Sequence, residues 1–126
     1  MPQNQSELVF TLDKLYQLKK DGSRITLDVI IGSKEQSPLL DVKLDSRNLL
    51  KDHDASVKNL DLGIDNNLSK KILSIVGNVT DTSAGSNKID VTIKIKGGIT
   101  DLNKKFSVTV EDDGEEVDID FNIRFK

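Results

Sequence analysis

The chain has 126 residues, a formal net charge of −3 and no cysteine, and its single histidine is His53. The length suits one domain that buries a core without staples, and the missing cysteines exclude disulfides, thiol nucleophiles and thiolate metal sites. The acidic balance, the absence of tryptophan and an aromatic fraction of 4% argue against a nucleic-acid partner, which needs basic surfaces and stacking side chains.

The first seven residues, from Met1 to Glu7, contain neither a basic start nor an apolar core. They therefore predict no export signal. No stretch of the chain approaches the ~20 apolar residues that a membrane helix needs. We expect a cytoplasmic protein without a membrane span, folded as a single domain over residues 1–126.

Period-two alternation of apolar and polar residues recurs along the chain. It is clearest in three runs and weaker in four others: 25–31, 89–95 and 117–125, then 40–44, 60–64, 73–79 and 106–110. Such alternation buries one face of a strand and exposes the other, as in antiparallel sheets. Only two alanines occur, while β-branched residues and leucine dominate, which also favours strands. The sequence predicts an all-β fold, an antiparallel β-sandwich of about seven to eight strands.

The segment 8–18 fits two structures. Asp21-Gly22 supplies the positive φ angles of a two-residue hairpin turn, which sets Leu18 opposite Ile25. A helix is the alternative, because apolar residues of this segment also recur at helical spacing, ahead of a glycine suited to ending a helix. The hairpin is favoured because its register agrees with its turn, but strand or helix stays open for 8–18.

Two longer hairpins follow from the same reasoning. Residues 25–31 can pair with 40–44, and residues 73–79 can pair with 89–95. Between residues 46 and 59 the alternation stops. Ser46 can cap a short helix in that interval, so one short helix is added to the expected fold.

A further hairpin is predicted at Asp113-Gly114. In its register three pairs of apolar residues face each other: Val110 with Val117, Val108 with Ile119, and Phe106 with Phe121. Apolar side chains that meet across a ladder stabilise a sheet. A slip of one residue would break the match, which supports this register.

The same turn carries the strongest acidic cluster of the chain. Its four members are Glu111, Asp112, Glu115 and Glu116. In the hairpin register like charges face each other, which is unfavourable, and Ca²⁺ would relieve the repulsion through oxygen ligands. The spacing does not match an EF-hand loop. The four residues are a candidate Ca²⁺ site, against the alternative of a solvated turn that discourages edge pairing.

His53 lies between Asp52 and Asp54, and an imidazole beside carboxylates can act as a general base. Neighbours in sequence do not usually converge in space, and no serine lies in a Gly-x-Ser-x-Gly elbow. The simpler interpretation is a surface histidine in a polar connection. No catalytic or cofactor-binding residue is assigned.

These features favour a non-catalytic protein-interaction or assembly module. A sandwich can present loops or an open edge strand to a partner protein, including another copy of itself. A Ca²⁺-dependent binding domain that uses the acidic loops is the alternative, and a hydrolase that uses His53 is a distant third. Apart from that Ca²⁺, no cofactor is expected.

Overall fold

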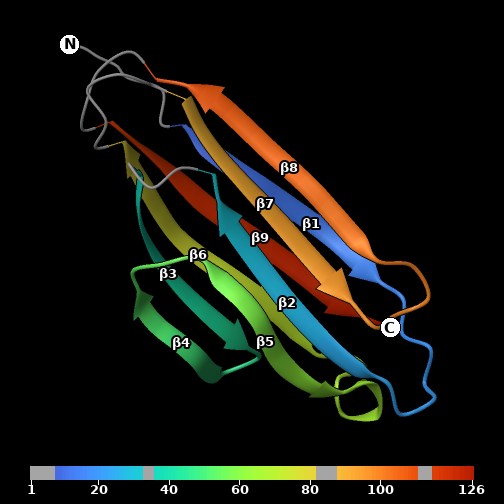
Figure 1. Ribbon diagram of the computed structural model, residues 1–126. Coiled ribbons are helices and arrows are strands. Elements are labelled where there is room, and N and C mark those ends of the chain that lie inside the picture. Colours follow the sequence, from blue (N-terminus) through green and yellow to red (C-terminus); the bar gives the residue numbers. More distant parts are fainter. Residues whose placement is uncertain (1–7, 33–35, 82–87, 111–114) are drawn as a thin grey trace.

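The computed structural model describes residues 8–32, 36–81, 88–110 and 115–126. Two sheets pack face to face (Figure 1), one of five strands in the order β1-β9-β6-β3-β4 and one of four in the order β5-β2-β7-β8. The strands are β1 (Val9–Tyr16), β2 (Arg24–Ile31), β3 (Gln36–Leu44), β4 (Arg47–His53), β5 (Val57–Ile64), β6 (Ile72–Asp81), β7 (Lys88–Lys96), β8 (Leu102–Thr109) and β9 (Glu116–Phe125). The predicted all-β sandwich is confirmed, with nine strands in the described residues.

The core lies between the sheets and is filled by the inward residues of the alternating runs. In β9 every second residue from Val117 to Phe125 is buried, while the intervening residues face solvent. β2 and β7 show the same alternation in the opposing sheet. The residues between the sheets are almost all aliphatic or aromatic, so burial of apolar surface holds the sandwich together.

The sheets are not wholly antiparallel. β1 pairs with β9 in parallel, from Val9 opposite Asp118 to Tyr16 opposite Phe125, and the other pairings are antiparallel. In the five-stranded sheet β9 lies between β1 and β6 (Figure 1). The segment 8–18 forms a strand over residues 9–16, and the helix considered for it is wrong.

The four predicted hairpins are wrong, because each joins strands that belong to different sheets. β1 and β2, β2 and β3, β6 and β7, and β8 and β9 each lie in opposite sheets. Consecutive strands pair directly only at β3–β4 and β7–β8 among the described elements. The turn residues Asp113 and Gly114 themselves lie outside the described residues.

One of the three predicted apolar contacts nevertheless exists in another form. Phe106 of β8 and Phe121 of β9 were expected to be neighbours within one sheet. Their rings stack across the core instead, with centroids 5.0 Å apart. A strand connection that crosses between sheets sets apolar residues against each other just as a hairpin does, so apolar matching could not separate the two arrangements.

The short helix expected within 46–59 is also wrong. The interval contains β4, a polar connection and the start of β5. Asp45 and Asp52 have positive φ angles, and the β3–β4 register shifts twice, between Leu40 and Val42 and between Val42 and Lys43. These irregularities break the period-two pattern, which is why the sequence did not show a strand here.

A buried carboxylate fixes the connection between β1 and β2. Asp65 is fully buried and accepts hydrogen bonds from the backbone N–H groups of Lys20, Asp21 and Gly22, at 2.8, 3.2 and 3.1 Å. Its own N–H donates to the carbonyl of Ser23 at 2.9 Å. The positive φ angles of Lys20 and Gly22 shape this connection, so Asp21-Gly22 belongs to a crossing between sheets rather than to a hairpin.

Asp65 begins the short 3₁₀ helix η1 (Asp65–Asn67), which links β5 to β6. In the part of the chain that the structure describes, no helix is long and apolar enough to cross a membrane.

Candidate functional site

The sandwich has four edge strands, which fall into two kinds. β4 and β5 lie on one side and are irregular: each has register shifts against its neighbour, and Asp52, Asn59 and Gly63 have positive φ angles. β1 and β8 form the other side, and each pairs with its neighbour over eight consecutive residues without a register shift. Irregular edges resist the addition of another strand, whereas regular edges offer a template for it.

The free edge of β1 is its side away from β9. Asp118 N–H donates to the Leu8 carbonyl and Lys126 N–H donates to the Tyr16 carbonyl, both at 2.9 Å. In a parallel ladder these bonds fix the even-numbered residues of β1 as those whose backbone groups face β9.

The odd-numbered residues of β1 therefore direct their N–H and C=O groups to the free edge. They are Val9, Thr11, Asp13 and Leu15. The next odd residue, Gln17, follows the same rule, because its carbonyl accepts the Ile99 N–H at 3.0 Å. The bond from Ile99 therefore ends the free edge at Gln17. The four odd-numbered residues that precede Gln17 have no backbone hydrogen-bond partner on this side among the described residues.

The side chains of β1 favour contact with another strand. On the outer face of the sheet Val9 and Leu15 are 48% and 52% exposed, in the same range as Leu39 of β3 and Val76 of β6. Between them lie the polar residues Thr11 and Asp13. Lys14 occupies a core-facing position but stays exposed because β1 is an edge.

β8, the other regular edge, carries more polar and charged side chains that discourage the addition of another strand. The outward residues of its middle, Lys105 and Ser107, are exposed and polar. Lys104 takes a core-facing position, with its ammonium 5.9 Å from the centroid of the Phe106 ring. Lysine on an edge strand discourages pairing, and β8 carries two lysines, Lys104 and Lys105, where β1 carries Lys14 alone. β1 therefore combines a regular free edge with exposed apolar side chains, and it is the stronger candidate for contact with a partner.

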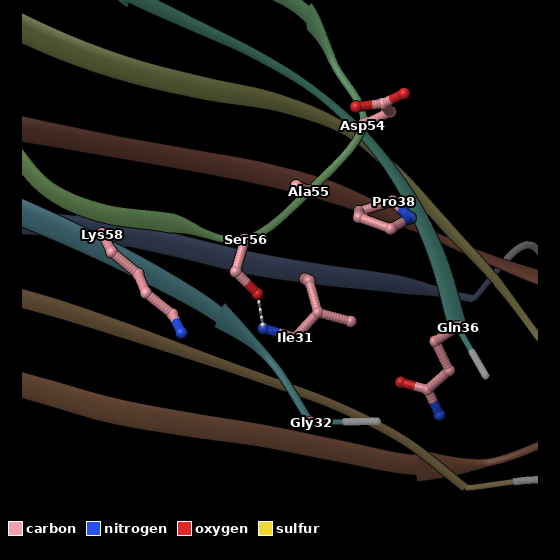
Figure 2. A pocket seen from close by; sticks show the side chains of 8 residues that line it. All are labelled: Ile31, Gly32, Gln36, Pro38, Asp54, Ala55, Ser56 and Lys58. Carbon is pink, nitrogen blue, oxygen red and sulfur yellow. Dashed lines mark hydrogen bonds between the residues drawn. The ribbon is translucent and has the colours of Figure 1, made fainter. Parts of the chain in front are cut away.

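A second feature is a hollow at the opposite side of the sandwich, with a volume of about 340 Å³. It lies between the end of β2, the start of β3, the connection 54–56 and the start of β5 (Figure 2). Ser56 contributes a hydroxyl that accepts the Ile31 N–H at 2.9 Å. Asp54 and Lys58 bring opposite charges, so the lining is mainly polar.

Gln36 is the buried polar residue of this hollow, with 7% of its surface exposed. Its Nε2 donates to the Lys88 carbonyl. Since a carbonyl only accepts, the amide oxygen must be the atom on the other side. Figure 2 shows that oxygen turned toward the side where Gly32 lies, and within the described residues it has no hydrogen-bond partner. A water molecule or a small hydrogen-bond donor would satisfy it.

His53 ends β4 beside this hollow and is half-buried. Its Nε2 lies 3.3 Å from the carbonyl oxygen of Ser56, so this nitrogen carries the proton. The Ser56 hydroxyl is bonded to Ile31 instead. The backbone N–H of Asp52 donates to Asp41 Oδ1 at 2.7 Å. Among the described contacts, His53 and Ser56 do not form the hydrogen bond that pairs a general base with a nucleophile.

The acidic cluster is only partly described. Glu111 and Asp112 lie outside the described residues. Glu116 begins β9 and is exposed, and the carbonyl of Glu115 accepts the Asp81 N–H at 2.9 Å. The hairpin register from which this facing of like charges was expected is wrong, since β8 and β9 belong to different sheets. Within the described residues no three His, Asp or Glu side chains gather as metal ligands do.

Sequence reasoning did not single out the β1 edge or Gln36. Leu15 belonged to the helical stripe considered for residues 8–18, Val9 belonged to neither the stripe nor the hairpin pairs, and Gln36 fell in an expected loop. A signal for the edge exists in Lys14, a charge at a core-facing position, which is typical of edge strands. No protein-family model, no curated protein and no solved structure matches this chain.

Proposed function

We propose that this chain is a non-catalytic protein-interaction or assembly module that binds an extended strand of a partner along the free edge of β1. The observation that carries the proposal is the set of outward backbone groups on Val9, Thr11, Asp13 and Leu15 in a strand without register shifts. Main-chain hydrogen bonds give affinity in strand addition, and alternate side chains give specificity.

The outer face of β1 defines what the partner strand must offer. Val9 and Leu15 need apolar residues opposite them, because burying their exposed surface stabilises the complex. Thr11 and Asp13, which lie between, need polar residues that accept or donate hydrogen bonds. Lys14 disfavours a partner strand that places a cation on the inner face, because like charges would then repel each other. The edge should therefore bind some strands in preference to others.

The test is a capture experiment from an extract of the source organism with three immobilised proteins: the wild type, Thr11→Pro and Thr11→Val. Proline removes an N–H that faces the free edge and leaves the ladder to β9 intact. Valine keeps the N–H and a β-branched shape. We expect the partner to be retained by the wild type and by Thr11→Val, and lost with Thr11→Pro.

Hydrogen exchange on the captured complex gives a direct readout at the same atoms. The amides of Thr11, Asp13 and Leu15 should exchange more slowly when the partner is bound. Retention of the same partner by a folded Thr11→Pro protein, together with unchanged exchange at these amides in the wild-type complex, would show that the partner binds elsewhere.

A further inference from the structure

The free edge of β1 is complementary to itself. If two copies meet edge to edge around a two-fold axis, their β1 strands run antiparallel and each residue pair occurs twice. Only the odd-numbered residues present backbone groups at this edge, so they must face one another. The register that sets Val9 opposite Leu15 pairs all four outward residues of each strand with those of the other copy.

The side chains agree with this register. On the outer face it brings the exposed Val9 against Leu15 of the second copy, so the two apolar residues bury each other. Thr11 meets Asp13, whose carboxylate can accept a hydrogen bond from the threonine hydroxyl. Asp13 also lies 3.8 Å from Arg124 of its own chain, which offsets its charge.

The inner face agrees as well. Leu12, which is half-buried, meets Leu12 of the second copy at the two-fold axis. Lys14 meets Phe10, whose ring is buried and stacked on Phe106, so no second cation faces the lysine. The charge that deters unrelated strands is therefore accommodated by this one.

The neighbouring registers are worse. A shift in one direction sets Asp13 against Asp13 and Val9 against Gln17, whose carbonyl is already bonded to Ile99. A shift in the other direction sets Val9 against Asp13 and leaves Leu15 without an outward described residue opposite it. Both lose the apolar pairs, and the first adds a repulsion between like charges.

We infer that the partner of the β1 edge is a second copy of this chain, in an antiparallel β1–β1 dimer with Val9 opposite Leu15. The inference rests on the proposed function, whose binding surface it uses. It joins the two five-stranded sheets into one continuous sheet. The contact is confined to one strand from each copy, so we expect a dissociation constant of about micromolar or weaker, as for small interfaces.

Sedimentation over a range of protein concentrations tests the dimer. The wild type and Thr11→Val should approach twice the monomer mass as concentration rises, and Thr11→Pro should need at least about ten times more protein. Leu15→Asp should weaken the dimer too, because it places a charge against Val9. Adding Val9→Lys to Leu15→Asp should restore it, since opposite charges then meet.

Single cysteines read the register, because the chain has no cysteine of its own. Leu12→Cys should form a disulfide-linked dimer under mild oxidation, since the two Cα atoms would lie about 4.5 Å apart at the axis. Thr11→Cys and Asp13→Cys report the two shifted registers and should cross-link far less. All variants are first compared with the wild type by thermal melting, so that only folded proteins are scored.

The outcomes separate the two proposals. A wild type that stays monomeric at all concentrations overturns the second-copy inference, while capture of another protein that is lost with Thr11→Pro would still support the proposed function. A dimer that persists in Thr11→Pro, or that cross-links best through Thr11→Cys or Asp13→Cys, also overturns the inference, because its contact lies elsewhere or in another register.

Discussion

At the scale of single residues, Asp65 shows how one side chain fixes a crossing between sheets. The connection from β1 to β2 has backbone N–H groups that no strand pairs, and three of them converge on this carboxylate. Because buried donors are costly when they lack acceptors, Asp65 stabilises this turn chiefly by satisfying its backbone.

The predicted effect of Asp65→Ala is a loss of about 2–4 kcal/mol in the free energy of unfolding, from several lost bonds to a buried acceptor. Denaturant titration measures the loss. Asp61→Ala is the matched control: Asp61 pairs with Arg24 at 2.6 Å and accepts the Gly63 N–H at 2.9 Å, but these bonds are exposed to solvent. Exposed pairs contribute about 0–1 kcal/mol. Equal losses in the two variants would contradict the role given to Asp65.

At the scale of elements, β9 is the strand on which the larger sheet depends. It pairs with β1 on one side and β6 on the other, and its inward residues are at most 2% exposed. Each large apolar side chain that is buried contributes about 1.5–3 kcal/mol, and several of them together rival the ~5–15 kcal/mol stability of a whole domain.

We therefore expect deletion of residues 117–126 to leave an unfolded or aggregated protein. Single substitutions refine the test, because neighbouring residues of β9 face opposite sides. Phe121→Ala should cost about 3–5 kcal/mol, whereas Asp120→Ala should stay within about 0.5 kcal/mol of the wild type. A truncated protein that melts cooperatively would show that β9 is peripheral.

The sequence pattern predicts the positions of most strands but not the order of the strands in the sheets. Alternation locates strands because it records which face each strand buries, and β2, β7 and β9 follow it closely. It does not record which strand lies beside which. Phe106 and Phe121 would meet in a hairpin and also meet across the core, so the edge position of β1 became visible only in the sheet order. β4 escaped notice because its bulges break the alternation.

At the scale of the whole molecule, Tyr16 couples stability to pH. Its hydroxyl donates to the Ile95 carbonyl at 3.2 Å and accepts the Gly98 N–H at 2.9 Å, so it ties β1 to the connection after β7. Burial is the main cause that raises the pKa of Tyr16 above its ordinary value of 10.0. The folded state holds the phenol proton more tightly than the unfolded state does.

Because of this difference, Tyr16 contributes stability that is fully present below pH 10 and is lost as the pH rises through its folded pKa. It is the only tyrosine and the chain has no tryptophan, so phenolate absorbance reports this residue alone. We expect a titration midpoint above 10 in the folded protein and near 10 in denaturant. Tyr16→Phe removes the tyrosine part of the alkaline slope. A folded midpoint at or below the denatured one would contradict the assignment.

The parallel contact of β1 with β9 has a consequence for the time course of folding. Val9 pairs with Asp118, 109 residues further along the chain (118 − 9), and contacts so distant in sequence form slowly. At a synthesis rate of ~5–20 residues per second, β1 waits about 5–20 seconds on the ribosome before its neighbour exists. During that delay both sides of β1 are unpaired, so the β1–β1 contact that we infer would compete with the later pairing of β1 with β9. The pairing of β1 with β9 takes place within one chain and comes late, whereas contact between two β1 strands takes place between copies and can come early. Dilution should therefore favour the pairing within the chain.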